Sequence, residues 1–424
     1  MVLTWLALVF FGMISFLFKD TIWFAENIDL VSWYIVFFTS IIFLTWVFFK
    51  YKDSTILTII YVGYLLRILL LIWDINFQHV FTLPGSGYDT EMFYARALRM
   101  FYQPEVHAER YSALVFRIFQ LFGPQRIIAQ YINLLLGMNS VIIAVNIVKQ
   151  YKKDKNTEMI ILLFGLLMPY FAIMNVLLLR EALIVFFIIS SLYFYILWFK
   201  DGKSWGIVMA VTCILLASTQ HSGSFAIAIG YAIGLIFYDR KSKSFHFKLK
   251  SISWILISFL FVYVIDYIFG STVFGQFQRI EGIGDLLTFA EEGLGAFGGA
   301  DYTVFINTGT EILDFIVNTP IRMLYFVLSP FPWYWRGPLD IIAFVFSSLF
   351  NGLFYYTAFK AIKTNEDREV LLLLLLTSIA CTFIFGWGVR NIGTAMRHRD
   401  KFLLLNIIMY SMCVPGLRRR RNWR

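Results

Sequence analysis

Charged residues are scarce in this chain of 424 residues, and their scarcity excludes a single soluble domain. Only 15% of the residues are Asp, Glu, Lys or Arg, whereas a typical soluble domain carries roughly 25%. Hydrophobic residues make up 59% of the chain, and the mean hydropathy is +0.71. Because roughly 20 consecutive apolar residues form one membrane-crossing helix, we expect most of the chain to lie in a lipid bilayer.

Cysteines and the usual nucleotide or metal motifs are also scarce. The three cysteines lie in apolar runs without metal-ligand spacing, which predicts neither a disulfide framework nor a zinc site. The chain has no Walker A loop, no Rossmann glycine fingerprint, no H-E-x-x-H motif and no EF-hand loop. The five histidines are scattered. We therefore expect no nucleotide-driven chemistry, no metal and no cofactor.

Long apolar stretches between polar breaks predict an all-α fold, a polytopic transmembrane helix bundle of about 12 spans, with a range of roughly 11 to 14. The chain 1–424 is then a single integral membrane domain. Its first stretch lacks the basic leader and the A-x-A site of a signal peptide, so we expect that stretch to be retained. The expected spans cover residues 2–18, 31–49, 54–73, 126–148, 158–174, 178–199, 204–219, 222–238, 251–269, 339–359, 369–388 and 401–416.

Short lysine-rich linkers after alternate spans orient the bundle. The positive-inside rule assigns all of them, and both termini, to the cytoplasm. Two large extracytoplasmic loops remain, 74–125 with amphipathic helices and 270–338, which ends in a re-entrant segment broken at Pro330 and Pro332. Basic residues outside the linkers are almost all arginines, whose planar fork suits phosphate and carboxylate groups.

The strongest local signal is the basic turn between the last two expected spans. Arg390, Arg397 and Arg399 crowd this turn on the side that the positive-inside rule disfavours. An anion would offset their mutual repulsion, and exposed backbone N–H groups of the turn would bind the same anion. Arg180 interrupts a long apolar run, where an ionisable side chain usually faces a cavity or a partner. An ion pair or a lipid headgroup is the alternative partner of these arginines.

Three residues are candidates for proton transfer. His221 lies in a short outward turn and titrates near neutral pH, although it could equally close the turn. Asp89 and Glu91 open an amphipathic helix of the first large loop. They either complement the helix dipole or, in a pocket, one of them removes the proton of a sugar hydroxyl.

Several of these residues together resemble bacterial polysaccharide polymerases of the Wzy and EpsG type. The residues are Gly87, Asp89 and Tyr94 early in an outer loop, Arg180 at the start of a span, and His221 in a later turn. The similarity covers residues 80–240, and the basic turn is a looser match. One departure is that those polymerases often carry an arginine just before the G-x-D, whereas this chain has Phe-Thr-Leu-Pro at 81–84.

The resemblance implies roles for individual residues within the wider GT-C class of glycosyltransferases. Arg180 and His221 would line the catalytic cavity, and Asp89 would lie at its rim. Arg397 and Arg399 would hold a pyrophosphate. The expected pyrophosphate and substrate ligands are completed by Arg390, Tyr94, Arg279 and Arg336.

The function expected from these observations is polymerisation of lipid-linked oligosaccharide repeat units into an exopolysaccharide, capsule or O-antigen. The donor and acceptor would both be polyprenyl-pyrophosphate-linked oligosaccharides, used at the outer face of the bacterial cytoplasmic membrane. Further partners would be membrane lipids, a chain-length regulator and a flippase, but no nucleic acid. The alternatives are an O-antigen-type ligase and a GT-C transferase that uses a polyprenyl-phosphate sugar. A lipid-linked sugar flippase is less favoured, because no internal repeat is visible.

Overall fold

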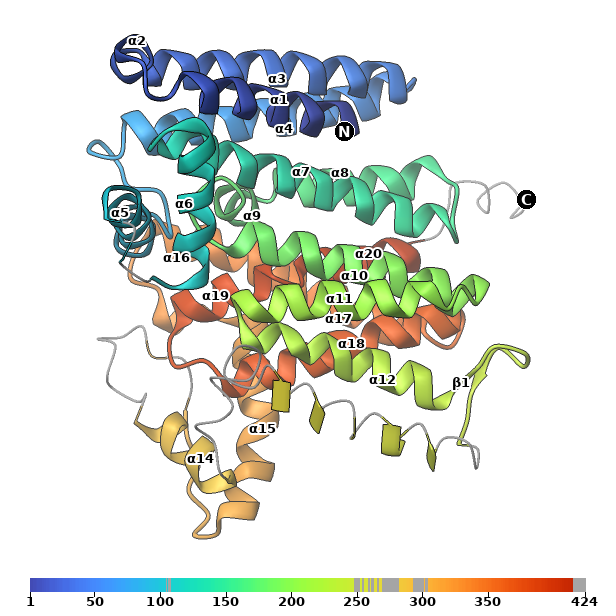
Figure 1. Ribbon diagram of the computed structural model, residues 1–424. Helices are drawn as coiled ribbons and strands as arrows, with labels where there is room; N and C mark the ends of the chain where they lie inside the picture. The colour runs from blue at the N-terminus through green and yellow to red at the C-terminus, as the bar shows by residue number, and fades with distance from the viewer. Residues whose placement is uncertain are drawn as a thin grey trace. The chain divides into compact units, whose positions relative to one another are not determined.

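The computed structural model describes residues 1–103, 105, 108–247, 282–292, 301 and 304–414, together with short stretches between 252 and 268. Helices dominate the described residues (Figure 1). The chain forms two compact units, which we describe separately. Unit 1 comprises Met1–Ile142 and Leu162–Phe186, and unit 2 comprises Ile143–Ile161 and Phe187–Arg424.

Unit 1 begins with apolar helices and continues into a helical loop segment. Its helices are α1 (Val2–Phe18), α2 (Ile22–Glu26), α3 (Ile28–Lys50), α4 (Ser54–Asn76), α5 (Tyr88–Tyr102), α6 (Arg110–Phe122), most of α7 (Arg126–Lys149), part of α8 (Lys155–Leu167) and α9 (Pro169–Met174). Helices α5 and α6 pack against each other (Figure 1).

Helix α5 is amphipathic, as the sequence predicts for the first large loop. Phe93, Ala97 and Met100 are buried at helical spacing, whereas Arg96 and Arg99 are exposed. Burying one apolar face against α6 stabilises a helix that is too short to be stable alone in water. The described residues of the predicted loop 74–125 therefore include two packed helices. That this segment lies on the extracytoplasmic side of the membrane remains a prediction.

Unit 2 is built around α18 (Arg368–Trp387), which packs against α12, α15 and α20. Gly230 of α12 permits this approach, because a Cβ at that position would lie 2.6 Å from the Cα of Thr377. The other elements are α10 (Glu181–Asp201), α11 (Trp205–Gln220), η1 (Ser222–Phe225), α12 (Ala226–Phe237), β1 (Tyr238–Asp239), β2 (Ser244–Phe245), α14 (Ile283–Glu291), α15 (Glu311–Leu328), η3 (Pro332–Tyr334), α16 (Pro338–Ala343), η4 (Phe344–Leu349), α17 (Phe350–Ala361), α19 (Ile392–Asp400) and α20 (Leu403–Cys413).

Six helical segments of the described residues are long and apolar enough to cross a membrane. Four shorter apolar helices coincide with further expected spans, so the predicted count of about 12 spans is not confirmed. The six are Ile28–Lys50, Ser54–Asn76, Arg126–Lys149, Glu181–Asp201, Pro338–Ala361 and Arg368–Trp387. The shorter ones are Val2–Phe18, Trp205–Gln220, Ser222–Phe237 and Leu403–Cys413.

Two other expected spans differ for identifiable reasons. The span predicted at 158–174 is divided into α8 and α9, because Pro169 has no N–H to continue a helix and disfavours helical geometry at Met168 before it. Nine of the 19 residues of the span predicted at 251–269 lie outside the described residues.

The second large loop contains the helix break that the prolines predict. Helix α15 ends at Leu328, and the 3₁₀ turn η3 begins at Pro332. At the other end of the same segment, Leu287 of α14 belongs to an apolar cluster with Trp387 of α18. Helices α14 and α15 of this segment therefore pack against α18. Its entry into the membrane remains a prediction.

Four linkers that the sequence assigns to the cytoplasm meet at one end of unit 2. They surround a cavity of about 460 Å³ whose lining includes Tyr151, Lys200, Lys243 and Asp367. These residues follow four different expected spans, so the linkers share one end of the unit, as alternating helices require. That this end is cytoplasmic remains a prediction.

Candidate functional site

Two histidines from different parts of the chain meet in unit 2. The ring centroids of His221 and His398 are 4.6 Å apart, and the rings are inclined at 78°. Phe385 packs against both, with its centroid 5.6 Å from His221 and 5.1 Å from His398. His221 is 8% exposed. The structure thus brings one predicted proton-transfer residue to a second histidine, which lies between two of the predicted anion ligands.

The local fold fixes the orientation of His221. Helix α11 ends at Gln220, and His221 caps the 3₁₀ turn η1 by accepting a hydrogen bond at Nδ1 from the backbone N–H of Gly223, 3.2 Å away. A neutral His221 therefore carries its proton on Nε2. A Cβ at residue 223 would lie 2.7 Å from the Phe385 ring, so glycine allows this turn to approach α18.

The other side of the histidine pair is held by the end of α18 and by α19. The buried Arg322 side chain donates hydrogen bonds to the carbonyl oxygens of Gly386 at 3.2 Å and Val389 at 2.6 Å. Gly386 belongs to the last turn of α18, where carbonyls lack partners within the helix, and Val389 follows the helix end. The Asn391 side chain then caps α19 by accepting from the Thr394 N–H at 2.8 Å. The sequence reasoning assigned no role to Arg322.

Helix α19 carries the basic residues of the predicted turn. Arg399 is 1% exposed, and its Nη1 donates to the Val327 carbonyl at 2.7 Å and to Ser348 Oγ at 3.2 Å. Arg397 is half-buried. Lys401 is buried, with Nζ 5.6 Å from the centroid of Phe385. Positive charge thus gathers around His398, although the contacts of Arg399 are those of a residue that joins α19 to neighbouring elements.

Two predicted anion ligands form ion pairs with acidic side chains. Arg390 Nη2 lies 3.1 Å from Glu292 Oε2, and its guanidinium stacks 3.7 Å from the Phe289 centroid. Arg336 pairs with Asp340 at 3.1 Å, and the hydrogen bonds from Arg336 to Asp340 raise the pKa of Arg336. Both arrangements match the alternative that the sequence left open. Arg279 lies outside the described residues.

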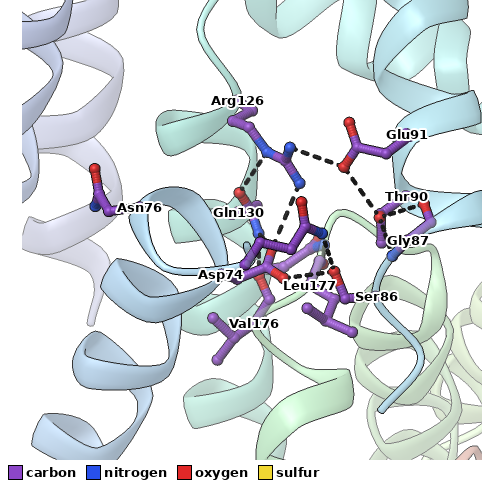
Figure 2. Close-up of polar contacts among 12 residues, drawn as sticks. Asp74, Asn76, Ser86, Gly87, Thr90, Glu91, Arg126, Gln130, Val176 and Leu177 are labelled. Atoms are coloured by element: carbon purple, nitrogen blue, oxygen red, sulfur yellow. Dashed lines mark hydrogen bonds and ion pairs between the residues drawn. The ribbon is translucent and has the colours of Figure 1, made fainter. Parts of the chain in front are cut away.

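A second polar cluster lies in unit 1 around Asp74, at the end of α4 (Figure 2). Asp74 is 1% exposed and accepts hydrogen bonds from Ser86 Oγ at 2.6 Å and Gln130 Nε2 at 2.7 Å. Arg126 Nη2 lies 3.4 Å from the same carboxylate, and its Nη1 donates to Glu91 Oε1 at 2.9 Å. Arg126 Nε donates to Gln130 Oε1 at 3.1 Å. Ends of α4, α5 and α7 are joined in this way.

Glu91 and Tyr94, both predicted site residues, belong to this cluster. The Tyr94 ring centroid lies 5.6 Å from Arg126 Cζ. Burial raises the pKa of Tyr94, so its hydroxyl stays protonated near neutral pH. Asp89 is half-buried in the first turn of α5. Sequence reasoning missed Asp74 and Arg126, although the criterion that selected Arg180, an ionisable residue at the end of an apolar run, also applies to both.

The backbone before Arg180 is held by polar side chains of α7. Residues 175–180 form turns between α9 and α10, with Val176, Leu177 and Leu179 fully buried. Asn133 Nδ2 donates to the carbonyls of Leu177 at 2.7 Å and Leu179 at 2.9 Å. Non-helical backbone at membrane depth requires such partners. Arg180 itself is half-buried at the end of this segment.

The predicted meeting of Arg180 with His221 and Arg397 stays a prediction, because these residues belong to separate units. Within unit 1 the structure assembles Glu91, Tyr94 and Arg126, and within unit 2 it assembles His221 and His398 beside a basic helix. In the described part of the chain, no group of three His, Cys, Asp or Glu residues has a metal-binding arrangement.

Comparisons with known proteins give one structural similarity. No protein-family model matches the chain, and no curated protein is significantly similar in sequence. The structure is similar to the crystal structure of the Archaeoglobus fulgidus oligosaccharyltransferase in the apo form, with 15% identity and a TM-score of 0.47. The match covers 85% of this chain and 50% of that one, so the chain spans half the length of the archaeal protein. A likeness of this size carries no argument about activity.

Proposed function

We propose that this protein is an integral membrane glycosyltransferase of the bacterial cytoplasmic membrane, with its active site on the outer side. Its reaction is polymerisation of polyprenyl-diphosphate-linked oligosaccharide repeat units. The observation that carries the proposal is the contact between His221, at the end of the apolar helix α11, and His398 of the basic helix α19. The helical bundle with six candidate spans supports the membrane setting.

The reaction requires a proton acceptor and a cationic site. The bond between the sugar C1 and the donor diphosphate oxygen breaks, and the electron pair leaves with the diphosphate. A hydroxyl oxygen of the second lipid-linked unit forms the new bond to C1, and its proton passes to a base. An imidazole suits this role because its ordinary pKa lies near neutral pH. We assign the proton to the His221–His398 pair.

Cations fixed in a water-poor site would stabilise the departing diphosphate. Arg397 precedes His398 in α19, and Lys401 follows the end of this helix, which places positive charge near the histidine pair in sequence. Arg180 is the expected third cation, on the resemblance to Wzy-type polymerases. Arg399 would act mainly by holding α19 in position, because its Nη1 is hydrogen bonded to Val327 and Ser348.

The test is to delete the gene in its host and to analyse extracted polyprenyl-linked glycans by mass spectrometry. A polymerase deletion should abolish long surface polysaccharide and accumulate single diphosphate-linked repeat units. Accumulation of lipid-linked polymer would instead identify a ligase. Repeat units that lack one sugar would identify a transferase that uses a polyprenyl-phosphate sugar. Unchanged surface glycan and unchanged lipid-linked pools would overturn the proposal.

A further inference from the structure

We propose that Arg126 is an anion-binding residue and that Glu91 is the counter-ion which a phosphate group displaces. The ligand class is a phosphate or diphosphate carried by a membrane lipid. The identification of that ligand as the lipid-linked sugar donor rests on the proposed function, whereas the binding chemistry of Arg126 does not. Arg126 lies outside the basic turn and is not among the anion ligands predicted from the sequence.

The guanidinium of Arg126 is oriented before any ligand arrives. Its Nε donates to Gln130 Oε1 at 3.1 Å, and its Nη2 lies 3.4 Å from the buried Asp74 carboxylate (Figure 2). Asp74 is itself fixed by Ser86 and Gln130. These contacts hold two edges of the planar group, and Nη1 points to Glu91. A fork oriented in this way loses little conformational freedom when it binds an anion.

Exposure distinguishes the two carboxylates that pair with Arg126. The side chain of Asp74 is 0% exposed, that of Arg126 is 15% exposed, and that of Glu91 is 46% exposed. Removing the partner of a buried charge is costly, so Asp74 keeps its cation. A pair with an exposed carboxylate contributes little to stability and exchanges readily. An anion can therefore replace Glu91 at Nη1 of Arg126, while Asp74 stays paired with the same guanidinium.

Helix α5 does not depend on Glu91 for its position. Phe93 is buried and packs 5.0 Å from the Tyr111 ring of α6, measured between centroids. The Thr90 hydroxyl closes the first turn of α5 through hydrogen bonds with Gly87 at 3.0 and 2.9 Å. The Glu91–Arg126 bond can open while these contacts remain, so displacement of Glu91 requires no unfolding of α5.

Gln130 links this anion site to the segment before Arg180. Its Nε2 donates to Asp74 Oδ2 at 2.7 Å and to the Val176 carbonyl at 3.3 Å. Arg126, Gln130 and Asn133 recur at the spacing of one helix face of α7. This face of α7 carries Arg126, and its Gln130 and Asn133 side chains donate hydrogen bonds to backbone carbonyls of the segment before Arg180. Two cations on one scaffold suit the two phosphates of a diphosphate.

The experiment measures binding of inorganic pyrophosphate to the full-length protein in nanodiscs of phosphatidylcholine, by isothermal titration calorimetry. Arg126→Gln should weaken binding roughly tenfold or more, since a charge-assisted hydrogen bond is lost. Arg126→Lys should weaken it less, and Glu91→Gln should tighten it because the competing carboxylate is removed. Arg96→Gln is the matched control, because Arg96 lies on α5, as Glu91 does, and forms an exposed pair with Glu109 at 2.5 Å.

Three results would overturn the inference. They are wild-type affinity in Arg126→Gln, weaker binding in Glu91→Gln, and the absence of saturable binding by the wild type. If Arg126→Gln fails to fold, as shown by size-exclusion chromatography, the opposite shifts expected for Arg126→Lys and Glu91→Gln still decide the question. If the Arg126–Glu91 pair were only structural, Arg126→Lys and Glu91→Gln would lose equal thermal stability, and Glu91→Gln would not bind pyrophosphate more tightly.

Two added lipids distinguish the source of the phosphate. Competition with pyrophosphate by undecaprenyl diphosphate but not by phosphatidylglycerol supports a lipid-linked donor, and competition by both supports a general headgroup site on the same residue.

The binding experiment and the gene deletion distinguish failure of this inference from failure of the proposed function. If Arg126 binds pyrophosphate while deletion of the gene leaves the glycans unchanged, only the proposed function fails. If deletion blocks polymerisation while Arg126→Gln binds and polymerises normally, only Arg126 fails.

Discussion

His221 and His398 stand edge to face with ring centroids 4.6 Å apart, although they belong to two turns that the sequence treats as independent. His221 also accepts the Gly223 N–H at Nδ1, which leaves Nε2 as the protonated nitrogen of its neutral form. Two imidazoles this close interact when either is charged, so their protonation is a property of the pair. In the proposed reaction we therefore treat the predicted candidate His221 and its neighbour His398 as one proton-transfer unit.

Alanine substitution of either histidine should slow polymer formation by roughly a hundredfold, the usual contribution of a positioned acid or base. The double variant should be no slower than the slower single variant, because both changes disable one unit. The measurement is initial rate against pH, in which the limb near neutral pH should disappear. His246→Ala is the control, since His246 lies near Asp239 in the β-hairpin, at 3.7 Å. Additive effects in the double variant would contradict the shared role.

Replacing Arg180 or Arg397 with Lys should shorten or abolish the polymer while the protein still inserts. Lysine keeps the positive charge but loses the planar fork that makes two parallel hydrogen bonds to a phosphate. Polymer length on a gel and the amount of membrane protein are measured together. Arg117→Lys, on α6, serves as the control, because this side chain is exposed and its Nη1 donates to Gln120 Oε1 at 2.8 Å. Normal chain length in either site variant would remove that arginine from the mechanism.

Single cysteines at the two ends of unit 2 test the predicted topology. Gly393 at α19 and Ser242 in the β-hairpin are both exposed. In a background with Cys413 replaced by alanine, Gly393→Cys should react with an impermeant thiol reagent in intact cells. Ser242→Cys should react only after permeabilisation, because the lysine-rich end is predicted to be cytoplasmic. The reverse pattern of labelling would overturn the outward assignment of the histidine pair.

Gly230→Ala should destabilise unit 2. The added methyl would lie 2.1 to 2.6 Å from atoms of Thr377, including its backbone Cα. Because the backbone is involved, α12 and α18 would have to move apart. Overpacking of this kind costs about 1 to 3 kcal/mol. Thermal unfolding in detergent, followed by size exclusion, should show a lower midpoint. Gly282→Ala is the matched control, since a Cβ there meets nothing within 4 Å, and its midpoint should be unchanged. Equal midpoints in the two variants would mean that α12 and α18 tolerate separation.

Acid should weaken the contact between α5 and α6. Burial alone would raise the pKa of Glu109, but hydrogen bonds from Ser112 and Arg96 outweigh burial and lower it below its ordinary 4.5. A carboxylate with a lowered pKa contributes stability that is fully present above pH 4.5 and is lost as the pH falls through the folded value. Unfolding midpoints between about pH 3 and 7 should therefore fall less steeply with acid in Glu109→Gln. Parallel curves for the two proteins would contradict this.

The sequence predicts the helices better than it predicts their number of crossings. Apolar runs mark both ends of α4 and α7 closely, because hydropathy and helix length are local properties. Pro169 divides another run, and this break is also visible locally, although the hydropathy of the run predicts one span. Whether a shorter helix such as α20 crosses a bilayer depends on its neighbours, which local hydropathy does not encode.

The candidate site can likewise be predicted only in part from the sequence. Glu91 and Tyr94 are recognisable from their place in an amphipathic helix, but their partner Arg126 lies on α7, and only the folded structure reveals these contacts. Likewise, the turn at His221 reaches His398 because Gly223 lets it approach Phe385. Contacts of this range depend on tertiary packing rather than on residue spacing.

The two hydrogen bonds donated by the Gln130 amide have a mechanical consequence. One nitrogen serves both the carboxylate that ends α4 and a carbonyl in the non-helical stretch after α9, so neither can shift without pulling on the other. Substitution of this single glutamine would let the two segments move independently. The effect would reach both the end of α4 and the segment after α9, which Gln130 connects.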